Sequence, residues 1–414
     1  MERVQRICLY IFCFSLNFEV WDPFETGGYF SISKFTGVLY FLASLPAILN
    51  YKTGIEFKPI LHSIGLFFGY LILINAINAD ANHNSVIDFT MLQSIILFWI
   101  LLNHAQSDPY VLEKGLLYFA FGSVVLALLY YNGIGIEIID NRVSIFGDNE
   151  NIIGQRMSFS ILIIAMVVLQ NRLQLNRARF LLLLLIPIML ELLIASGSRL
   201  AVISLLAVFV ASVMLFKVNN ALIKIVVLAV GLVGFIAIWQ MLMNNDLIGV
   251  RLQRSFQEGD LSSRDEIWKS IMPLIEQNPV FGVGKTGYAT YCNSVFGRYW
   301  SPHNVILEIL CFSGIIGLSI YLFFLYQTFR MGYLTYKQNA TLLPVLFMIN
   351  IVGLLLVSHF LELKIGWTLL AYIASSHLIN ATSDNITDGI SLGPYDTIEQ
   401  TNDEDSYEWL DVGR

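Results

Sequence analysis

Apolar runs long enough to cross a bilayer recur along almost the whole chain and restrict its fold more than any other feature. A helix needs about 20 apolar residues to span the hydrocarbon core, where the backbone must satisfy its own hydrogen bonds. We expect spans near residues 5–20, 35–50, 59–78, 86–103, 115–132, 152–170, 180–196, 200–216, 221–243, 303–328, 341–357 and 360–380. The sequence therefore predicts an all-α fold, a polytopic membrane helix bundle of about 12 transmembrane helices.

The charged residues are few and unevenly placed. They make up 13% of the chain, against about 25% in a typical soluble domain. The net charge is −7, and much of the acid follows the last apolar run. The near-neutral body argues against nucleic acid as a partner. We expect residues 382–414 to be a disordered tail, either a solubilising end or a docking segment. Its acidic residues are Asp384, Asp388, Asp396, Glu399, Asp403, Glu404, Asp405, Glu408 and Asp411.

The basic residues between the spans predict the orientation of the chain, because cytoplasmic connections are enriched in Lys and Arg. One side carries Arg3, Arg6, Lys52, Lys58, Lys114, Arg172, Arg177, Arg179, Lys217, Lys224, Arg330 and Lys337. The short connections of the opposite side carry only Lys34, Arg142 and Arg199. Both termini are then cytoplasmic, and the long connection 244–302 lies on the outer face.

Four regions follow from these assignments. Residues 1–243 hold the first nine transmembrane helices, and residues 244–302 form a long, partly helical outer loop. Residues 303–381 hold helices 10–12, and residues 382–414 form the tail. Inverted halves, which are typical of secondary transporters, are not visible in the sequence.

The long outer loop contains a predicted amphipathic helix with an arginine at its start. Residues 264–277 carry apolar side chains at helical spacing, and Pro279 follows shortly after them. Arg264 lies in the first turn, beside Trp268 on the rim of the apolar stripe. A guanidinium there can reach lipid phosphates and can grip a diphosphate through paired donors. The alternative is an ordinary interfacial arginine.

Two further motifs lie in the second half of this loop and at its end. Gly282-Val283-Gly284-Lys285-Thr286-Gly287 fits G-x-G-x-x-G, but no βαβ unit surrounds it, so we interpret it as a tight turn. An anion-binding backbone nest at Gly284 is the alternative. His303 opens the tenth expected span, where a neutral imidazole at a positive helix end could accept a proton from a hydroxyl. A capping or interfacial histidine is the alternative, and Asn304 could cap the helix or orient a sugar.

Other ionisable side chains are expected near the same outer face. Arg199 follows the small turn Ser196-Gly197-Ser198, and Glu191 lies two turns earlier in the apolar region. Arg142 and Arg156 flank a polar connection. The shared side of these arginines indicates an anionic ligand. No Asp-x-Asp cluster is present there, which argues against a required divalent metal, and we predict no cofactor.

Several short motifs, taken together, resemble the O-antigen ligase/polymerase superfamily of bacterial membrane glycosyltransferases. They are Arg264-x-x-x-Trp268, Asn278-Pro279-x-Phe281-Gly282-x-Gly284, His303-Asn304-x-x-Leu307-x-x-Leu310, Gly314-Ile315-x-Gly317 and Ser198-Arg199. The close resemblance covers about residues 199–320, and the expected topology extends it to most of the chain. The combination is specific, whereas each single motif is not.

The resemblance implies a multi-pass protein of the bacterial inner membrane with its active site facing the periplasm. Such enzymes take a glycan from an undecaprenyl-diphosphate carrier, without a metal or a nucleotide. Ligases transfer it to a sugar hydroxyl of lipid A–core, and polymerases transfer it to another repeat unit of a growing glycan. In the ligases, the arginines that match Arg199 and Arg264 engage the diphosphate, and the histidine that matches His303 activates the acceptor.

We therefore hypothesise an O-antigen ligase that inverts the anomeric centre. Its catalytic residues are His303 as base with Arg264 and Arg199 on the diphosphate, and its substrate-binding residues are Arg142, Arg156, Trp268, Asn304 and Gly284. An O-antigen or exopolysaccharide polymerase is the alternative within the superfamily. A glycan-lipid flippase or transporter is the alternative from another class, supported mainly by Glu191. A structural partner in a polysaccharide-assembly complex is a third.

Overall fold

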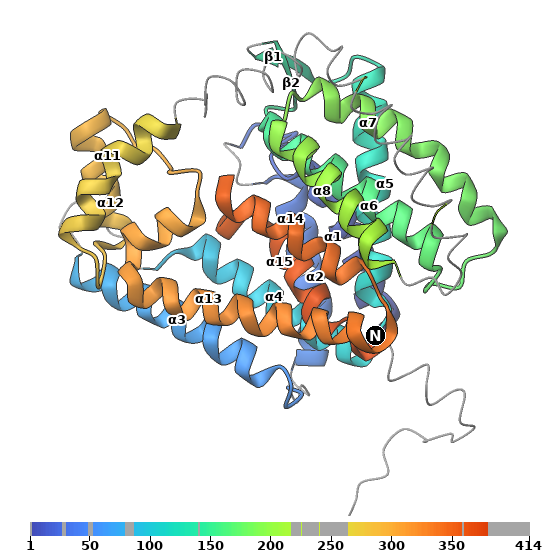
Figure 1. Cartoon of the computed structure of the whole chain (residues 1–414), viewed down its shortest axis with the longest axis horizontal. Coiled ribbons are helices and arrows are strands. Elements are labelled where there is room, and N and C mark those ends of the chain that lie inside the picture. Colours follow the sequence, from blue (N-terminus) through green and yellow to red (C-terminus); the bar gives the residue numbers. More distant parts are fainter. Residues whose placement is uncertain are drawn as a thin grey trace, which may run out of the picture.

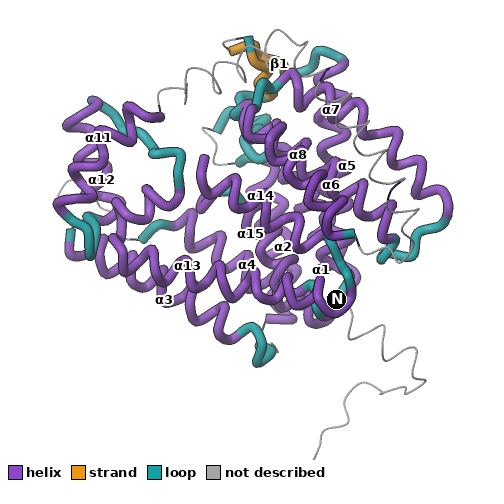
Figure 2. The backbone as a smooth tube through the Cα atoms, viewed as in Figure 1, coloured by secondary structure: helices purple, strands orange, loops and turns teal. Residues whose placement is uncertain are grey.

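The computed structural model describes residues 2–26, 30–48, 53–78, 87–139, 141–216, 225, 240, 264–357 and 360–379, most of which are helical (Figure 2). The expected span 221–243 falls almost entirely outside the described residues, and the acidic tail 382–414 does so completely. The remaining expected spans coincide with helices, although their bounds differ by several residues. Apolar runs of this length therefore identified the helical segments that the structure describes.

The elements follow one another with short connections. The first half comprises α1 (Glu2–Ser15), η1 (Leu16–Phe18), α2 (Ile32–Ile48), α3 (Lys58–Ile77), α4 (Phe89–Ser107), α5 (Val111–Tyr131), β1 (Ile136–Ile139), β2 (Arg142–Ile145) and α6 (Glu150–Gln170). The second half comprises η2 (Arg177–Leu185), α7 (Ile186–Ala195), α8 (Arg199–Leu215), α11 (Arg264–Gln277), α12 (Gly284–Phe296), α13 (Val305–Asn339), α14 (Leu343–Val357), η3 (Phe360–Glu362) and α15 (Lys364–Ser375).

Six described helical segments are long and apolar enough to cross a membrane. They are Lys58–Ile77, Phe89–Ser107, Val111–Tyr131, Glu150–Gln170, Arg177–Ala195 and Val305–Asn339. Shorter apolar helices cover Ile32–Ile48, Arg199–Leu215 and Leu343–Leu356. The chain is thus a mostly helical, multi-pass membrane protein, while the total of about 12 spans stays a prediction.

The helices pack into a bundle around α6. This helix contacts α5, α7 and α8, and its side chains are buried around most of its circumference. A helix that is apolar on all sides belongs in the interior of a membrane bundle. Around it, α1 packs on α2 and α5, α15 packs on α4, and α13 runs along α3.

A short β-hairpin between α5 and α6 departs from the all-α expectation. Its strands are antiparallel, and Ile136 pairs with Ile145. The Trp21 ring stacks on Phe146 with 4.3 Å between centroids, which joins the hairpin to the connection after η1. Each strand has four residues, which is too few for a two-residue periodicity to stand out in the sequence.

Helix α13 also departs from the single span expected over 303–328. Gly314 has φ +60° and ψ −162°, which divides α13 into residues 305–313 and 315–339. The 35 residues together would make a straight helix about 52 Å long, well beyond a hydrocarbon core of about 30 Å. Figure 1 shows the short first part turning away from the long second part, which follows α3.

The connections that the sequence assigns to the outer face meet at one end of the bundle. Lys285 Nζ lies 2.7 Å from an Asp88 carboxylate oxygen, and Lys364 Nζ lies 2.5 Å from one of Glu19. These contacts join connections that are far apart in the sequence. We call α11, α12 and residues 297–304 the outer lobe; Figure 1 shows α11 and α12 together beside α3 and the start of α13.

Candidate active site

The first helix of the outer lobe positions Arg264 and Trp268. They lie four residues apart in α11, and side chains at this spacing share one face of a helix. The predicted helix over 264–277 is confirmed, and its buried side chains Ile267, Ile271 and Leu274 hold it against the rest of the protein. Trp268 Nε1 donates a hydrogen bond of 2.8 Å to the carbonyl of Pro302. The helix that begins at Arg264 is therefore tied to the turn that carries His303.

The turn at His303 has an uncommon backbone conformation. His303 has φ +50°, a left-handed region that non-glycine residues rarely adopt and that is enriched at functional sites. Its N–H donates to Ser301 Oγ at 3.2 Å. Asn304 Oδ1 accepts from the N–H groups of Ile306 at 3.0 Å and Leu307 at 3.1 Å. The expected capping role of Asn304 is thus confirmed, and the half-buried His303 lies at a helix N-terminus.

Helix α12 holds this turn and α11 together. The Tyr288 hydroxyl donates to the carbonyl of Trp300 at 2.8 Å, and the Tyr291 hydroxyl donates to the carbonyl of Ser270 at 2.7 Å. Burial raises the pKa of Tyr288 well above its usual range, so its hydroxyl stays protonated and available as a donor. Side chains of α12 thus fix the two segments that carry Arg264 and His303.

Two glycines let the outer lobe meet the break in α13. Gly282 has φ +70°, and a Cβ on it would overlap the backbone at residues 312–314. A Cβ on Gly314 would overlap the carbonyl of Val280. The N–H of Ile315, freed by the break, donates to the carbonyl of Pro279 at 2.9 Å. The predicted tight turn is confirmed, and it caps the second part of α13.

Gly284 closes the same turn with φ +72°. A Cβ there would contact Asn75 of α3, whose side-chain oxygen accepts the N–H of Lys285 at 2.8 Å. This geometry gives Gly284 a packing role. Its role in substrate binding stays a prediction.

The Arg199 turn lies between α7 and α8. Ser198 Oγ accepts the N–H of Ala201 and caps α8, of which Arg199 is the first residue. Arg142 Nε donates to the carbonyl of Ser196 at 3.0 Å, so β2 supports this turn from one side. A Cβ on Gly154 would overlap Ser196 and Ser198, so α6 supports it from another. Arg142 therefore positions the turn of Arg199, and its contact with substrate stays a prediction.

Arg156 has a different environment from the other arginines. Its side chain is 1% exposed and forms ion pairs with Asp148 and with Glu19, the latter at 3.7 Å. It also donates to the carbonyl of Asn17 at 3.2 Å. Burial raises the pKa of Asp148, whereas the guanidinium of Arg156 opposes that rise. The geometry favours a structural role for Arg156, and its expected contact with substrate stays a prediction.

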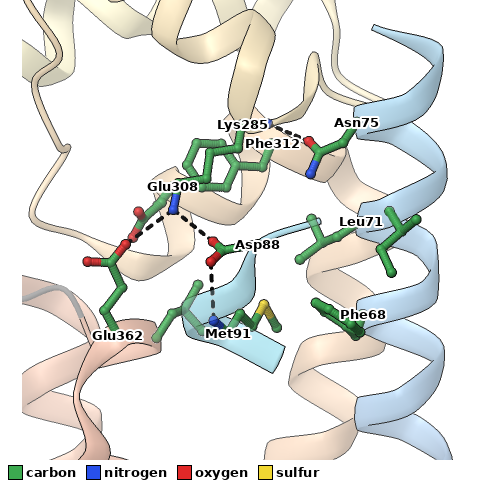
Figure 3. Close-up of a pocket in the computed structure, with 11 residues that line it drawn as sticks. Phe68, Leu71, Asn75, Asp88, Met91, Lys285, Glu308, Phe312 and Glu362 are labelled. Atoms are coloured by element: carbon green, nitrogen blue, oxygen red, sulfur yellow. Dashed lines mark hydrogen bonds and ion pairs between the residues drawn. The ribbon is translucent and has the colours of Figure 1, made fainter. Parts of the chain in front are cut away.

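A polar pocket beside the outer lobe was missed by the sequence analysis. Lys285 Nζ lies between Asp88 at 2.7 Å and Glu362 at 3.2 Å, and the buried carboxyl of Glu308 lines the same pocket (Figure 3). The available signal was Glu308 itself, an acidic residue at the start of an apolar run. Asp88 and Glu362 carry no such signal, because only the fold brings them together.

Metal binding has little support from this pocket. The Lys285 ammonium lies between Asp88 and Glu362, where a cation would otherwise bridge them. The described part of the chain contains no group of three or more His, Cys, Asp or Glu side chains that could hold a metal ion.

The structure thus groups the predicted residues in two places. Arg264, Trp268, His303 and Asn304 lie in the outer lobe, whereas Arg142 and Arg199 belong to the α7–α8 turn and the hairpin. No curated protein matches the chain. Residues 180–322 match the family described as O-antigen ligase, and this range includes Arg199, Arg264 and His303. The resemblance in the motifs is confirmed: the chain carries a domain of the O-antigen ligase superfamily.

Proposed function

We propose that this protein is an O-antigen ligase that transfers a glycan from undecaprenyl diphosphate to a sugar hydroxyl of lipid A–core. The observation that carries the proposal is the hydrogen bond from Trp268 to Pro302, which ties the helix of Arg264 to the turn of His303. An anion-binding arginine and a candidate base then belong to one rigid lobe. The family match over residues 180–322 supports the same reaction class.

The proposed chemistry separates the two roles. As the glycosidic bond to the diphosphate breaks, negative charge grows on the leaving group, and Arg264 and Arg199 stabilise it through preorganised donors. His303 takes the proton of the acceptor hydroxyl, whose oxygen attacks the opposite face of the anomeric carbon and inverts it. Trp268 and Asn304 bind the substrate at the same lobe, and the reaction needs neither a metal nor a nucleotide.

The proposed topology places the outer lobe in the periplasm. The protein spans the bacterial inner membrane about 12 times, with both termini and the tail 382–414 in the cytoplasm. The meeting of the outer-face connections at one end of the described bundle supports this arrangement. The regions 1–243, 244–302 and 303–381 are proposed as nine spans, the outer loop and three spans.

A polymerase of the same superfamily differs mainly in its acceptor, and gene deletion in the host separates the two. With a ligase, the lipopolysaccharide ladder disappears on a gel and polymer accumulates on the carrier lipid. With a polymerase, the core keeps a single repeat unit. An unchanged lipopolysaccharide pattern would contradict both assignments for this glycan.

The transporter alternative depends on Glu191. This residue lies on an exposed face of α7 among the described residues, whereas a transport path requires polar groups in the interior at mid-depth. Sealed vesicles with labelled lipid-linked glycan test the alternative directly. An enzyme releases free carrier diphosphate, whereas a transporter moves the labelled lipid unchanged.

A further inference from the structure

Glu308 is a buried carboxyl group with an oxygen that has no hydrogen-bond partner. The residue is 5% exposed, and its Oε2 finds no partner in the described part of the chain. Such a group is costly to bury, and more so beside a membrane, where water is scarce. A carboxyl kept in this state indicates a ligand or a function rather than stability.

The group faces a small pocket with apolar walls. Phe68, Leu71 and Phe312 line it together with the polar cluster, and Figure 3 shows Glu308 directed toward the same space as Asp88 and Glu362. The cavity measures about 20 Å³, which accommodates about one water molecule or one hydroxyl group. Lys285 and Glu362 are partly exposed and form its outer rim. A single polar atom can therefore enter, but a sugar ring or a phosphate cannot.

The charges of the pocket select the kind of polar atom. Asp88, Glu308 and Glu362 are three carboxyl groups around a single ammonium, that of Lys285. Burial lowers the pKa of Lys285, but the contacts with Asp88 and Glu362 outweigh this effect and raise it, so the ammonium stays charged. An anion is repelled by this balance, whereas a hydroxyl can donate to a carboxyl oxygen and accept from the ammonium.

The pocket has a fixed relation to the turn of His303. Glu308 lies one turn into α13, and its N–H donates to the carbonyl of Asn304 at 2.9 Å. The break at Gly314 makes residues 305–313 a short helix of their own. His303 and Glu308 therefore sit at the start of one rigid segment, with the pocket beside the proposed catalytic turn.

We propose that Glu308, with Lys285, binds one hydroxyl group of a sugar in the glycan substrate and positions that sugar for transfer. The sugar hydroxyl donates to Glu308 Oε2, and its oxygen accepts the third N–H of Lys285, whose other two donate to Asp88 and Glu362. This inference rests on the proposed function and adds a subsite for sugar, separate from the arginines for diphosphate. The hydroxyl belongs to the donor glycan or to the acceptor.

The test uses the full chain in lipid nanodiscs and the variants Glu308→Gln, Glu308→Ala and Glu276→Gln. Glu276 is an exposed carboxylate on α11 and serves as the matched control. The donor is lipid-linked glycan extracted from the deletion host, and the acceptor is lipid A–core from the same host. Transfer rates are measured while one substrate is varied and the other is saturating, so a change in KM assigns the hydroxyl to donor or acceptor.

A glutamine keeps an acceptor oxygen but loses the charge, so we expect Glu308→Gln to raise one KM about 5-fold to 10-fold with kcat nearly unchanged. Glu308→Ala should raise the same KM about 30-fold or more, because Lys285 then faces an apolar wall. Glu276→Gln should match the wild type. Unchanged KM values, or a fall in kcat alone, in both Glu308 variants would overturn the inference.

The absence of transfer by the wild type would instead overturn the proposed function, and the subsite is then judged by binding. The thermal midpoint of each protein is measured with and without the extracted lipid-linked glycan and lipid A–core. A shift for the wild type that Glu308→Ala loses supports the sugar subsite. Equal shifts, or none, contradict it.

Discussion

Arg264 and Arg156 belong to the same expected outer face, yet the structure gives them opposite environments. Arg156 is buried in the bundle between Asp148 and Glu19, and its charge is balanced inside the protein. Arg264 lies partly exposed on the first turn of α11, in a lobe tied to the His303 turn. One residue type thus stabilises the fold in one region and is available to a substrate in the other. Burial and partners, rather than the identity of the side chain, separate the two roles.

Loss of Arg156 should have the largest effect on stability. Arg156→Ala leaves the buried carboxylate of Asp148 without its main partner, which costs about 3–5 kcal/mol. We expect a strongly reduced yield of folded protein and a lower thermal midpoint in detergent. Arg156→Ala with Asp148→Asn removes both charges and should recover part of the loss. Normal stability combined with lost glycan transfer would mean that Arg156 contacts substrate, and the contrast with Arg264 would fail.

The glycine contact between the outer lobe and α13 comes next. Gly314→Ala combines a left-handed backbone with an overlap against Val280, and each such strain costs about 1–3 kcal/mol. Gly297 is the matched control, because it has φ +70° but open space around its Cβ position. We expect Gly314→Ala to lower the thermal midpoint more than Gly297→Ala does. Equal shifts would show that backbone strain alone, and not the close approach, determines the cost.

The smallest predicted change concerns the hydrogen bond that joins the parts of the outer lobe. Trp268→Phe removes the donor to Pro302 and should cost about 1 kcal/mol, or roughly a 5-fold loss in transfer rate. Trp21→Phe is the control, because Trp21 stacks on Phe146 at the hairpin, outside the outer lobe. If the Trp268 variant transferred glycan at the wild-type rate, the Trp268–Pro302 bond would not position the site.

Much of this architecture could be predicted from the sequence, because burial in a bilayer requires long apolar runs. The helix at Arg264 and the cap at Asn304 were predicted for a similar reason, since helical spacing and capping are local properties. The break at Gly314 was not predicted, because an apolar run with one glycine also suits a continuous helix. What requires the break is the close contact with residues 280–282, which only the fold reveals.

The candidate site was predictable to a similar degree. Local pattern indicated Arg264 and His303, and the fold then showed that one hydrogen bond from Trp268 connects their segments. The pocket of Lys285 and Glu308 combines residues from α3, α12, α13 and the starts of α4 and α15. Contacts between such distant segments leave no spacing in the sequence, so the pocket could not be predicted. Arg156 shows the converse, because its expected ligand is replaced by Asp148 and Glu19.

The most direct test of the central claim is glycan transfer by Arg264→Lys in nanodiscs, with Arg298→Lys as control. Both residues lie in the outer lobe, but Arg298 stacks over Trp300 at 4.5 Å from the ring centre. An ammonium cannot copy the paired donors of a guanidinium on a diphosphate. We therefore predict that Arg264→Lys lowers kcat about 100-fold to 1,000-fold with an unchanged thermal midpoint, while Arg298→Lys stays near wild type. Transfer by Arg264→Lys at the wild-type rate would contradict the assignment of Arg264 to the diphosphate.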